Sequence, residues 1–233
     1  MKIKQTLKIL VDIAMTVVLM FLMSYMLAGP QVHEWLGCVM FVLFILHHIL
    51  NFNWHKNIFK GKYSFYRALM LIVDVLIFFG MMVSMVTGII LSMYVFKFVN
   101  ISSGLAASRS LHMLAAYWNF VLLSVHLGLH WSMMAARMAK PWMNMIKNKT
   151  LLSVLTWLVR AVMTALAVYG LILFKQENII GYLTGSVMFA FYDFGETAMQ
   201  FVIKYMIIME SLVFIVYYVR KAVTYVTGHF KHA

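Results

Sequence analysis

The sequence is poor in acidic residues, proline and cysteine. Its 233 residues include 7 acidic side chains, 2 prolines and 1 cysteine, and charged residues make up 11% of the chain. Because Cys38 is the single thiol, a disulfide framework, a cysteine-bound iron–sulfur cluster and haem attachment through CxxCH are excluded. The sequence also has no P-loop, no GxGxxG fingerprint, no nucleophile-elbow motif and no short-period repeat. The chemistry of the protein must therefore reside in its apolar segments.

Hydrophobic residues are abundant instead. They account for 64% of the chain, more than a soluble domain of this length needs. Six apolar segments are each close to the ~20 residues that cross ~30 Å of hydrocarbon as a helix; they cover residues 7–28, 34–54, 68–96, 110–135, 151–174 and 197–219. The first is too long for a signal-peptide core, so we interpret it as a retained span. The prediction is an all-α, polytopic membrane protein with a six-helix transmembrane bundle.

Basic residues gather between particular spans and give the chain a net charge of +12. The second loop, the fourth loop and the C-terminal tail hold Lys56, Lys60, Lys62 and Arg67, then Arg137, Lys140, Lys147 and Lys149, then Arg220, Lys221 and Lys231. By the positive-inside rule, this distribution predicts a multi-pass protein of the cell inner membrane with both termini in the cytoplasm. Topology and contact with anionic membrane lipid account for the basicity, so nucleic acid is not an expected partner.

Four histidines recur at one spacing in two predicted spans. His33 and His47 lie 14 residues apart in the second span, and His112 and His126 lie 14 residues apart in the fourth. Fourteen residues advance a helix by about 21 Å and return the side chain to within about 40° of the same face. Both spans run from outside to inside. His33 and His112 therefore lie at the same depth near the outer surface, and His47 and His126 lie at the same depth nearer the cytoplasm. Facing imidazoles at two depths are what two bis-histidine b haems stacked across a membrane require.

Other residues compete with these four or support them. At the inner level His48 and His130 are alternative ligands, and His130 also suits a propionate contact or a proton donor at a quinone site. Arg109, three residues before His112, is placed to pair with an outer propionate. A lone histidine at a helix end is more often an interfacial polar group, but ionisable groups inside membranes are costly and the repeated spacing favours ligands.

Further ionisable residues within the spans need partners. Asp12 and Asp74 lie at similar cytoplasmic depth. Arg160 and Glu210 match in depth in the last two spans, which predicts an ion pair, whereas Lys204 has no evident partner. The expected role of these groups is to hold helices together, with a proton or quinone path as the functional alternative.

Three ordered motifs resemble a family of bacterial flavinylation-associated cytochromes, small membrane proteins with a cytochrome b-like layout. The motifs are "HEWLGCVMFVLFILHHILNFNW", "TGIILS" and "RSLHMLAAYWNFVLLSVHLGLHW", and the similarity covers about residues 8–135. The resemblance implies transmembrane electron transfer through b-type haem, often serving extracytosolic proteins that carry covalent flavin. It implies the same ligand candidates, His33, His47, His112 and His126, with His48 and His130 inside the motifs. The C-terminal part, with "FAFYDFGE", resembles an extension found in some members.

These observations predict two domains, a four-helix haem-binding core at 1–140 and a two-helix membrane extension at 141–233. The outer loop of the extension carries an aromatic cluster, with Asp193 and Glu196 expected to face water. The predicted function is electron transfer between a quinol or cytoplasmic donor and an extracytosolic acceptor, as a subunit of an oxidoreductase rather than a stand-alone enzyme. The alternatives are a metal-ion or proton transporter that uses the same histidines, for which Glu34 beside His33 is the one close carboxylate, and a structural or assembly subunit.

Overall fold

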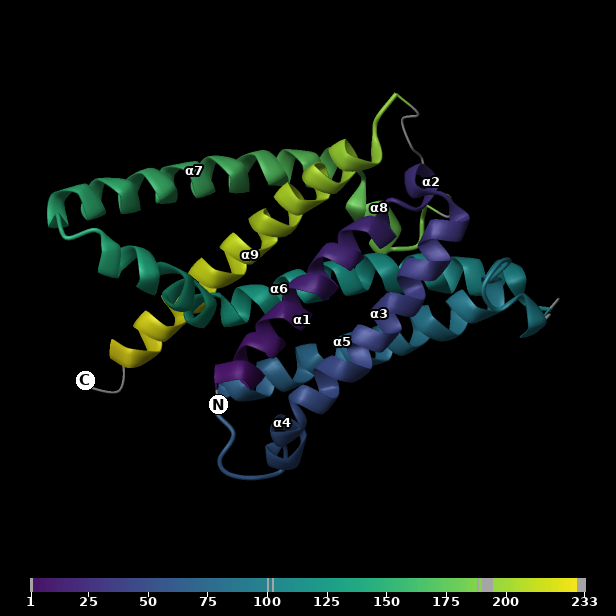
Figure 1. The fold of residues 1–233 in the computed structure, drawn as a ribbon, viewed down its shortest axis with the longest axis horizontal. Coiled ribbons are helices and arrows are strands. Elements are labelled where there is room, and N and C mark those ends of the chain that lie inside the picture. The colour runs from purple at the N-terminus through teal and green to yellow at the C-terminus, as the bar shows by residue number, and fades with distance from the viewer. Residues whose placement is uncertain (1, 100, 102, 188, 190–194, 230–233) are drawn as a thin grey trace. The chain divides into compact units, whose positions relative to one another are not determined.

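A computed structural model describes residues 2–99, 101, 103–187, 189 and 195–229 of the chain (Figure 1). The described residues form helices joined by turns, with no strand among them. The α-helices are α1 (Lys2–Met23), α2 (Tyr25–Ala28), α3 (Pro30–Leu50), α4 (Phe52–Asn57), α5 (Phe65–Leu91), α6 (Leu105–Met145), α7 (Lys149–Gln176), α8 (Ile179–Leu183) and α9 (Ala198–His229). Six of them, α1, α3, α5, α6, α7 and α9, are long and apolar enough to cross a membrane, which confirms the prediction of an all-α protein with six candidate spans.

The helix boundaries differ from the apolar segments at the first connection. The first segment was predicted to continue to residue 28, but α1 ends at Met23 and the chain makes a short second helix before α3. Gly29 takes a φ of +87°, a conformation that glycine adopts without steric cost, and Pro30 follows as the first residue of α3. Gly29 and Pro30 therefore set the turn between α2 and α3, while at the end of α1 the Ser24 hydroxyl donates to the Phe21 carbonyl oxygen at 2.8 Å.

Helix α6 is much longer than the fourth apolar segment. Its 41 residues correspond to about 60 Å at 1.5 Å per residue, roughly twice the hydrocarbon thickness. Arg137 and Lys140, which the sequence placed in a loop, lie on this helix, and Pro141 is accommodated within its last turns. The connection between the fourth and fifth spans is therefore partly helical, since its charged residues are themselves good helix formers.

The chain separates into two compact units, Met1–Phe120 with Ile180–Tyr205, and Val121–Ile179 with Met206–Ala233. We refer to them as unit 1 and unit 2. Both α6 and α9 contribute residues to each unit. The division into a haem-binding core at 1–140 and an extension at 141–233 was based on which helices would bind a cofactor. The two compact units do not test it, so it stays a prediction.

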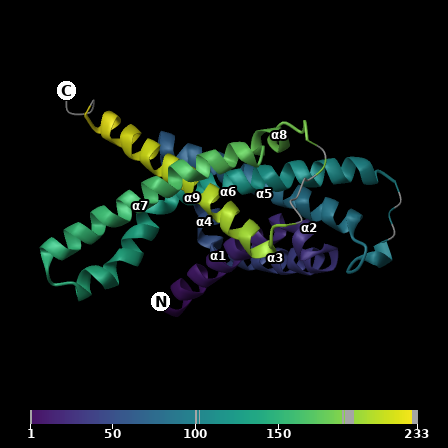
Figure 2. The ribbon, with the colours of Figure 1, turned by 90° about the horizontal axis from the view of Figure 1, so that it is seen from above.

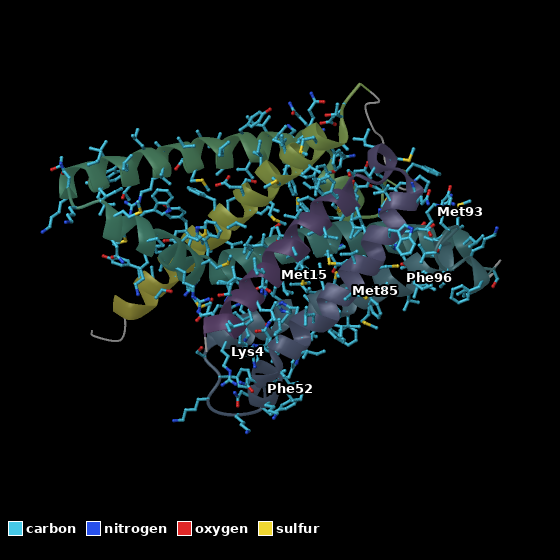
Figure 3. All side chains as sticks on the ribbon, viewed as in Figure 1. Lys4, Met15, Phe52, Met85, Met93 and Phe96 are labelled. Atoms are coloured by element: carbon cyan, nitrogen blue, oxygen red, sulfur yellow. The ribbon has the colours of Figure 1, made fainter. Side chains whose placement is uncertain are left out.

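In unit 1, α3 lies along α1, and α5 packs on α3 (Figures 1 and 2). Met20 and Met40 are buried among these helices, 1% and 4% exposed. The two ends of this part of unit 1 are marked in Figure 3 by Met93 and Phe96 at one end and by Lys4 and Phe52 at the other. The ends correspond to the outer and inner levels of the predicted histidine pairs on α3.

In unit 2, two glycines bring helices close to α9. A Cβ on Gly170 of α7 would lie 2.5 Å from the Ile207 carbonyl oxygen, and one on Gly128 of α6 would lie 2.7 Å from Cβ of Val216. Small residues at such crossings are the usual way for membrane helices to pack closely. Arg220 adds a polar tie, donating from Nη1 to the carbonyl oxygen of α6 residue Leu129 at 2.6 Å.

The predicted ion pair of unit 2 does not form. Both carboxylate oxygens of Glu210 are buried without a hydrogen-bond partner among the described residues. The guanidinium of Arg160 instead lies over the Trp157 ring, 5.3 Å from its centroid. The pairing was inferred from depth alone, and equal depth does not require that two helices turn the two side chains toward each other.

Candidate functional site

His33 and His112 come together in unit 1, as the spacing predicted for the outer level. Their ring centroids lie 6.0 Å apart with the planes at 69°. Two imidazoles that bind one metal ion through nitrogen, with bonds of about 2.0–2.1 Å, place their ring centres roughly 6 Å apart. The separation of the two rings therefore suits a shared iron atom.

A threonine on α5 fixes the tautomer of His112. The Thr87 hydroxyl donates to the Val83 carbonyl oxygen at 2.6 Å, and the same oxygen lies 3.0 Å from Nδ1 of His112. A hydroxyl has one proton to donate, so in the second contact Thr87 accepts and Nδ1 of His112 is the donor. The neutral ring then carries its free lone pair on Nε2, the nitrogen that a metal ion needs.

The ring of His33 has a nitrogen that the protein itself does not satisfy. Its Nδ1 is buried and has no hydrogen-bond partner in the described part of the chain, although a buried polar atom normally has one. On α5, Gly88 allows that helix to approach the His112 ring closely, since a Cβ there would lie 3.4 Å from Cε1 of His112. A buried ring nitrogen of this kind fits a metal-bearing group such as haem.

Glu34 has a role that the sequence did not indicate. Its carboxylate accepts hydrogen bonds from the Ser92 hydroxyl at 2.6 Å and from the backbone N–H groups of Met93, Tyr94 and Val95 at 2.7–2.9 Å. These bonds fasten the segment after α5 to the start of α3, directly beside the outer histidine. They involve both carboxylate oxygens, and the zinc-ligand role considered for Glu34 from the sequence stays untested.

At the other end of α3, His47 belongs to a polar chain of side chains. Its Nδ1 lies 2.8 Å from Oδ1 of Asp12 on α1, and its Nε2 lies 3.5 Å from Nδ2 of Asn51. Oδ1 of Asn51 in turn accepts from Nζ of Lys8 at 2.8 Å. Histidines that bind metal commonly donate their second ring nitrogen to a carboxylate, so Asp12 is placed to orient His47 as a ligand.

The remaining inner candidates occupy different surroundings. Nδ1 of His48 lies 3.0 Å from Nε2 of His55, and the His48 ring packs edge-on against Phe44 at 4.4 Å. His126 and His130 lie close to each other on α6, with ring centroids 4.7 Å apart. Since His47 and His48 belong to unit 1 and the two α6 histidines to unit 2, the inner pairing stays a prediction from helix spacing.

The other sequence-predicted residues lie apart from the histidines. Arg109 is solvent-exposed on α6, one turn before the outer ligand candidate, and its pairing with a propionate stays a prediction. Glu196 does not face water freely: it accepts from Nζ of Lys204 at 2.9 Å, which gives that lysine the partner the sequence did not reveal. Asp193 and most of the aromatic cluster beside it lie outside the described residues.

Comparison with known proteins adds no family assignment. No family model, no curated protein and no solved structure matches the chain. The likeness to the flavinylation-associated cytochromes therefore rests on the motifs alone, and the case for a function rests on the geometry of unit 1.

Sequence reasoning missed Thr87, Glu34 and Asp12 as supporting residues. Thr87 stands inside the quoted "TGIILS" motif, and Asp12 is an acid inside a predicted span, which by itself suggests a functional partner. Neither signal names that partner, because the contact depends on how neighbouring helices are rotated.

Proposed function

We propose that the protein is a transmembrane cytochrome b that holds an outer haem between His33 and His112 and an inner haem between His47 and His126. The observation that carries the proposal is the outer ring pair, with centroids 6.0 Å apart and a buried ring nitrogen of His33 without a partner. Haem b, when bound, supplies one-electron redox chemistry. The repeated 14-residue spacing on α3 and α6 supports a second, inner site of the same kind.

The residues around the outer pair supply what such a site needs from a protein. Thr87 keeps a proton on Nδ1 of His112 and so directs Nε2 toward the ligand. Glu34 holds the segment after α5 against the start of α3, which limits the access of water to the outer site. The Tyr25 ring packs edge-on against His33 with centroids 5.0 Å apart, and an apolar surrounding of this kind tunes a redox potential.

The chain lacks the sequence motifs of flavin, nicotinamide and iron–sulfur domains, so it is proposed to act as one subunit of a larger oxidoreductase. Its donor is a quinol or a cytoplasmic protein, and its acceptor an extracytosolic redox protein. The resemblance to flavinylation-associated cytochromes supports a flavin-carrying protein as that acceptor. The metal-ion transporter alternative has less support, since the described residues include no group of three or more His, Cys, Asp or Glu side chains that could hold a metal ion.

An absorption spectrum of the purified protein tests the proposal. We expect sharp α and β bands after reduction with dithionite and two haems per chain by the pyridine haemochrome assay. His112→Ala should remove the outer haem alone and His126→Ala the inner haem alone, leaving one haem per chain in each. His48→Ala and His130→Ala serve as matched controls and should keep both haems. Loss of the inner haem in either variant would make that histidine, rather than His47 or His126, the inner ligand. A colourless protein from haem-replete cells, or full haem content in His112→Ala, would overturn the proposal.

A further inference from the structure

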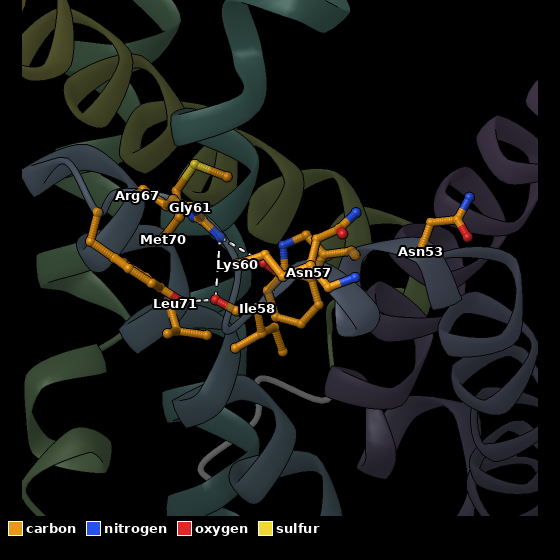
Figure 4. Close-up of a pocket in the computed structure, with 10 residues that line it drawn as sticks. Asn53, Asn57, Ile58, Lys60, Gly61, Arg67, Met70 and Leu71 are labelled. Carbon is orange, nitrogen blue, oxygen red and sulfur yellow. Dashed lines mark hydrogen bonds between the residues drawn. The ribbon is translucent and has the colours of Figure 1, made fainter.

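Unit 1 contains a cavity of about 570 Å³ at the connection between α4 and α5 (Figure 4). Polar side chains on its wall are those of Asn53, Asn57 and Lys60, and apolar ones include Trp54, Met70 and Leu71. A volume in this range is typical of small-molecule sites in proteins. The cavity thus combines a cationic and amide side with an apolar side.

Arg67 builds the cavity from the first turn of α5. Its Nη2 donates to the carbonyl oxygens of Asn57 at 2.7 Å and Ile58 at 3.2 Å, and its Nη1 donates to that of Lys62 at 3.3 Å. The guanidinium also lies over the Tyr63 ring, 4.3 Å from its centroid, and the Tyr63 hydroxyl donates to the Ile58 carbonyl oxygen. The dashed lines in Figure 4 show the Arg67 bonds that hold the connection in place. The cavity is therefore held by specific bonds and is not a gap between loose loops.

The charge of the cavity is not balanced by acidic residues. Neither Lys60 nor Arg67 forms an ion pair with a carboxylate in the part of the chain that the structure describes, in contrast to His47 and Lys204. The carbonyl oxygens that Arg67 contacts are neutral and leave its positive charge in place. Two uncompensated cations beside a concave wall attract an anion, and oxygen-rich groups such as phosphate match these donors.

The position of the cavity relative to the spans indicates where that anion comes from. It is lined by α4, the connection after it and the first turns of the candidate membrane span α5, at the end that the basic residues predict to be cytoplasmic. Trp54 and Tyr63 are 39% and 45% exposed, as aromatic residues at a membrane–water interface commonly are. A phosphate at this depth would belong to a lipid headgroup, with the apolar wall of Met70 and Leu71 beside the upper acyl chain.

We propose that this cavity binds the phosphate of an anionic phospholipid, held by Lys60 and Arg67. The general attraction of basic loops to anionic leaflets does not need a cavity, a fixed guanidinium or a particular lysine. A specific site needs all three, so replacing Lys60 should lower lipid affinity more than replacing a lysine in another connection. The inference does not depend on haem binding, because none of the residues of the cavity is among the proposed haem ligands.

Native mass spectrometry of the full chain in detergent tests the site. Phosphatidylglycerol and phosphatidylcholine with the same acyl chains are titrated into the wild type, Lys60→Gln and Lys147→Gln, a variant that removes the same charge from the connection between α6 and α7. A basic residue near the surface changes lipid affinity about fivefold. We therefore expect about fivefold weaker phosphatidylglycerol binding in Lys60→Gln, a clearly smaller change in Lys147→Gln because that lysine lies outside the cavity, and no effect of either on phosphatidylcholine.

Two further arms separate the sources of phosphate and control for folding. Glycerol 1-phosphate added at millimolar concentration should leave the bound phosphatidylglycerol in place, because it lacks the acyl chains. If it displaces the lipid, a soluble phosphate is the ligand and the lipid proposal is overturned. Equal affinity for the two lipids, or equal loss in the two variants, also overturns it. Unchanged melting temperatures of both variants show that the comparison is made on folded protein.

Discussion

Replacing Thr87 by valine removes the oxygen that accepts the Nδ1 proton of His112 while nearly preserving the shape of the side chain. Thr87 is 5% exposed and its oxygen lies 3.0 Å from the ring nitrogen, so no water readily replaces it. Leaving a buried donor unsatisfied costs about 1–3 kcal/mol. If the ring must keep this orientation to bind iron, that cost converts to roughly 5- to 150-fold weaker haem binding, within the range of about 10- to 100-fold seen for residues that support metal ligands.

Haem titration into the purified, haem-depleted protein measures this loss. The titration follows the Soret band, and His126→Ala is used as the background so that the outer site is observed alone. Thr87→Ser keeps the hydroxyl and should bind haem within about threefold of that background, since only a methyl group is lost. Circular dichroism and gel filtration establish that all variants are folded. Equal haem affinity in Thr87→Val and its background, or equal loss in the valine and serine variants, would refute the assigned role of the hydroxyl.

Four other variants test contacts elsewhere in the chain. Glu196→Gln should lower the melting temperature in detergent by the equivalent of about 1–3 kcal/mol, because it removes the carboxylate that pairs with Lys204. Glu210→Gln should leave the melting temperature unchanged or raise it, because the buried carboxylate oxygens of Glu210 have no hydrogen-bond partner among the described residues. A larger loss in Glu210→Gln than in Glu196→Gln would contradict both assignments. Gly170→Ala should destabilise the protein by about 1–3 kcal/mol, because the new methyl group meets the backbone carbonyl of Ile207. A thermal-shift measurement that shows no loss of stability would contradict the close packing of α7 on α9. If the proposed inner haem binds at His47, Asp12→Asn should raise its potential by about tens of millivolts, because the imidazole loses a hydrogen-bonded carboxylate. An unchanged redox titration would separate Asp12 from the site.

The same polar residue type plays unlike roles in this chain, and only its neighbours distinguish them. Glu34 accepts four hydrogen bonds from one short segment, whereas the carboxylate oxygens of Glu210 accept none from the described residues. Both residues lie in helices long and apolar enough to span a membrane. Depth in a span therefore says that an acidic residue needs a partner, but not whether it has one.

For the histidines too, the sequence predicted positions better than it predicted neighbours. A spacing of 14 residues on each of two helices predicted that His33 and His112 would meet, and they do. The prediction succeeded because helical periodicity fixes which residues share a face, and topology fixes which ends lie level. For His47 the ligand role stays a prediction, and the sequence did not reveal its contact with the Asp12 carboxylate.

By itself, the sequence determined that this protein is helical, that six segments are long and apolar enough to span a membrane, and which histidines recur on one face. These properties depend on hydrophobicity and on the 3.6-residue period, which are local and can be read along the chain. Only the tertiary structure decided that Thr87 sets the tautomer of His112, that Glu34 fastens the segment after α5, and that Lys204 pairs with Glu196. Such contacts depend on the rotation of each helix about its axis and on the path of the connections, which the packing of the whole chain selects from many arrangements with the same hydrophobic pattern.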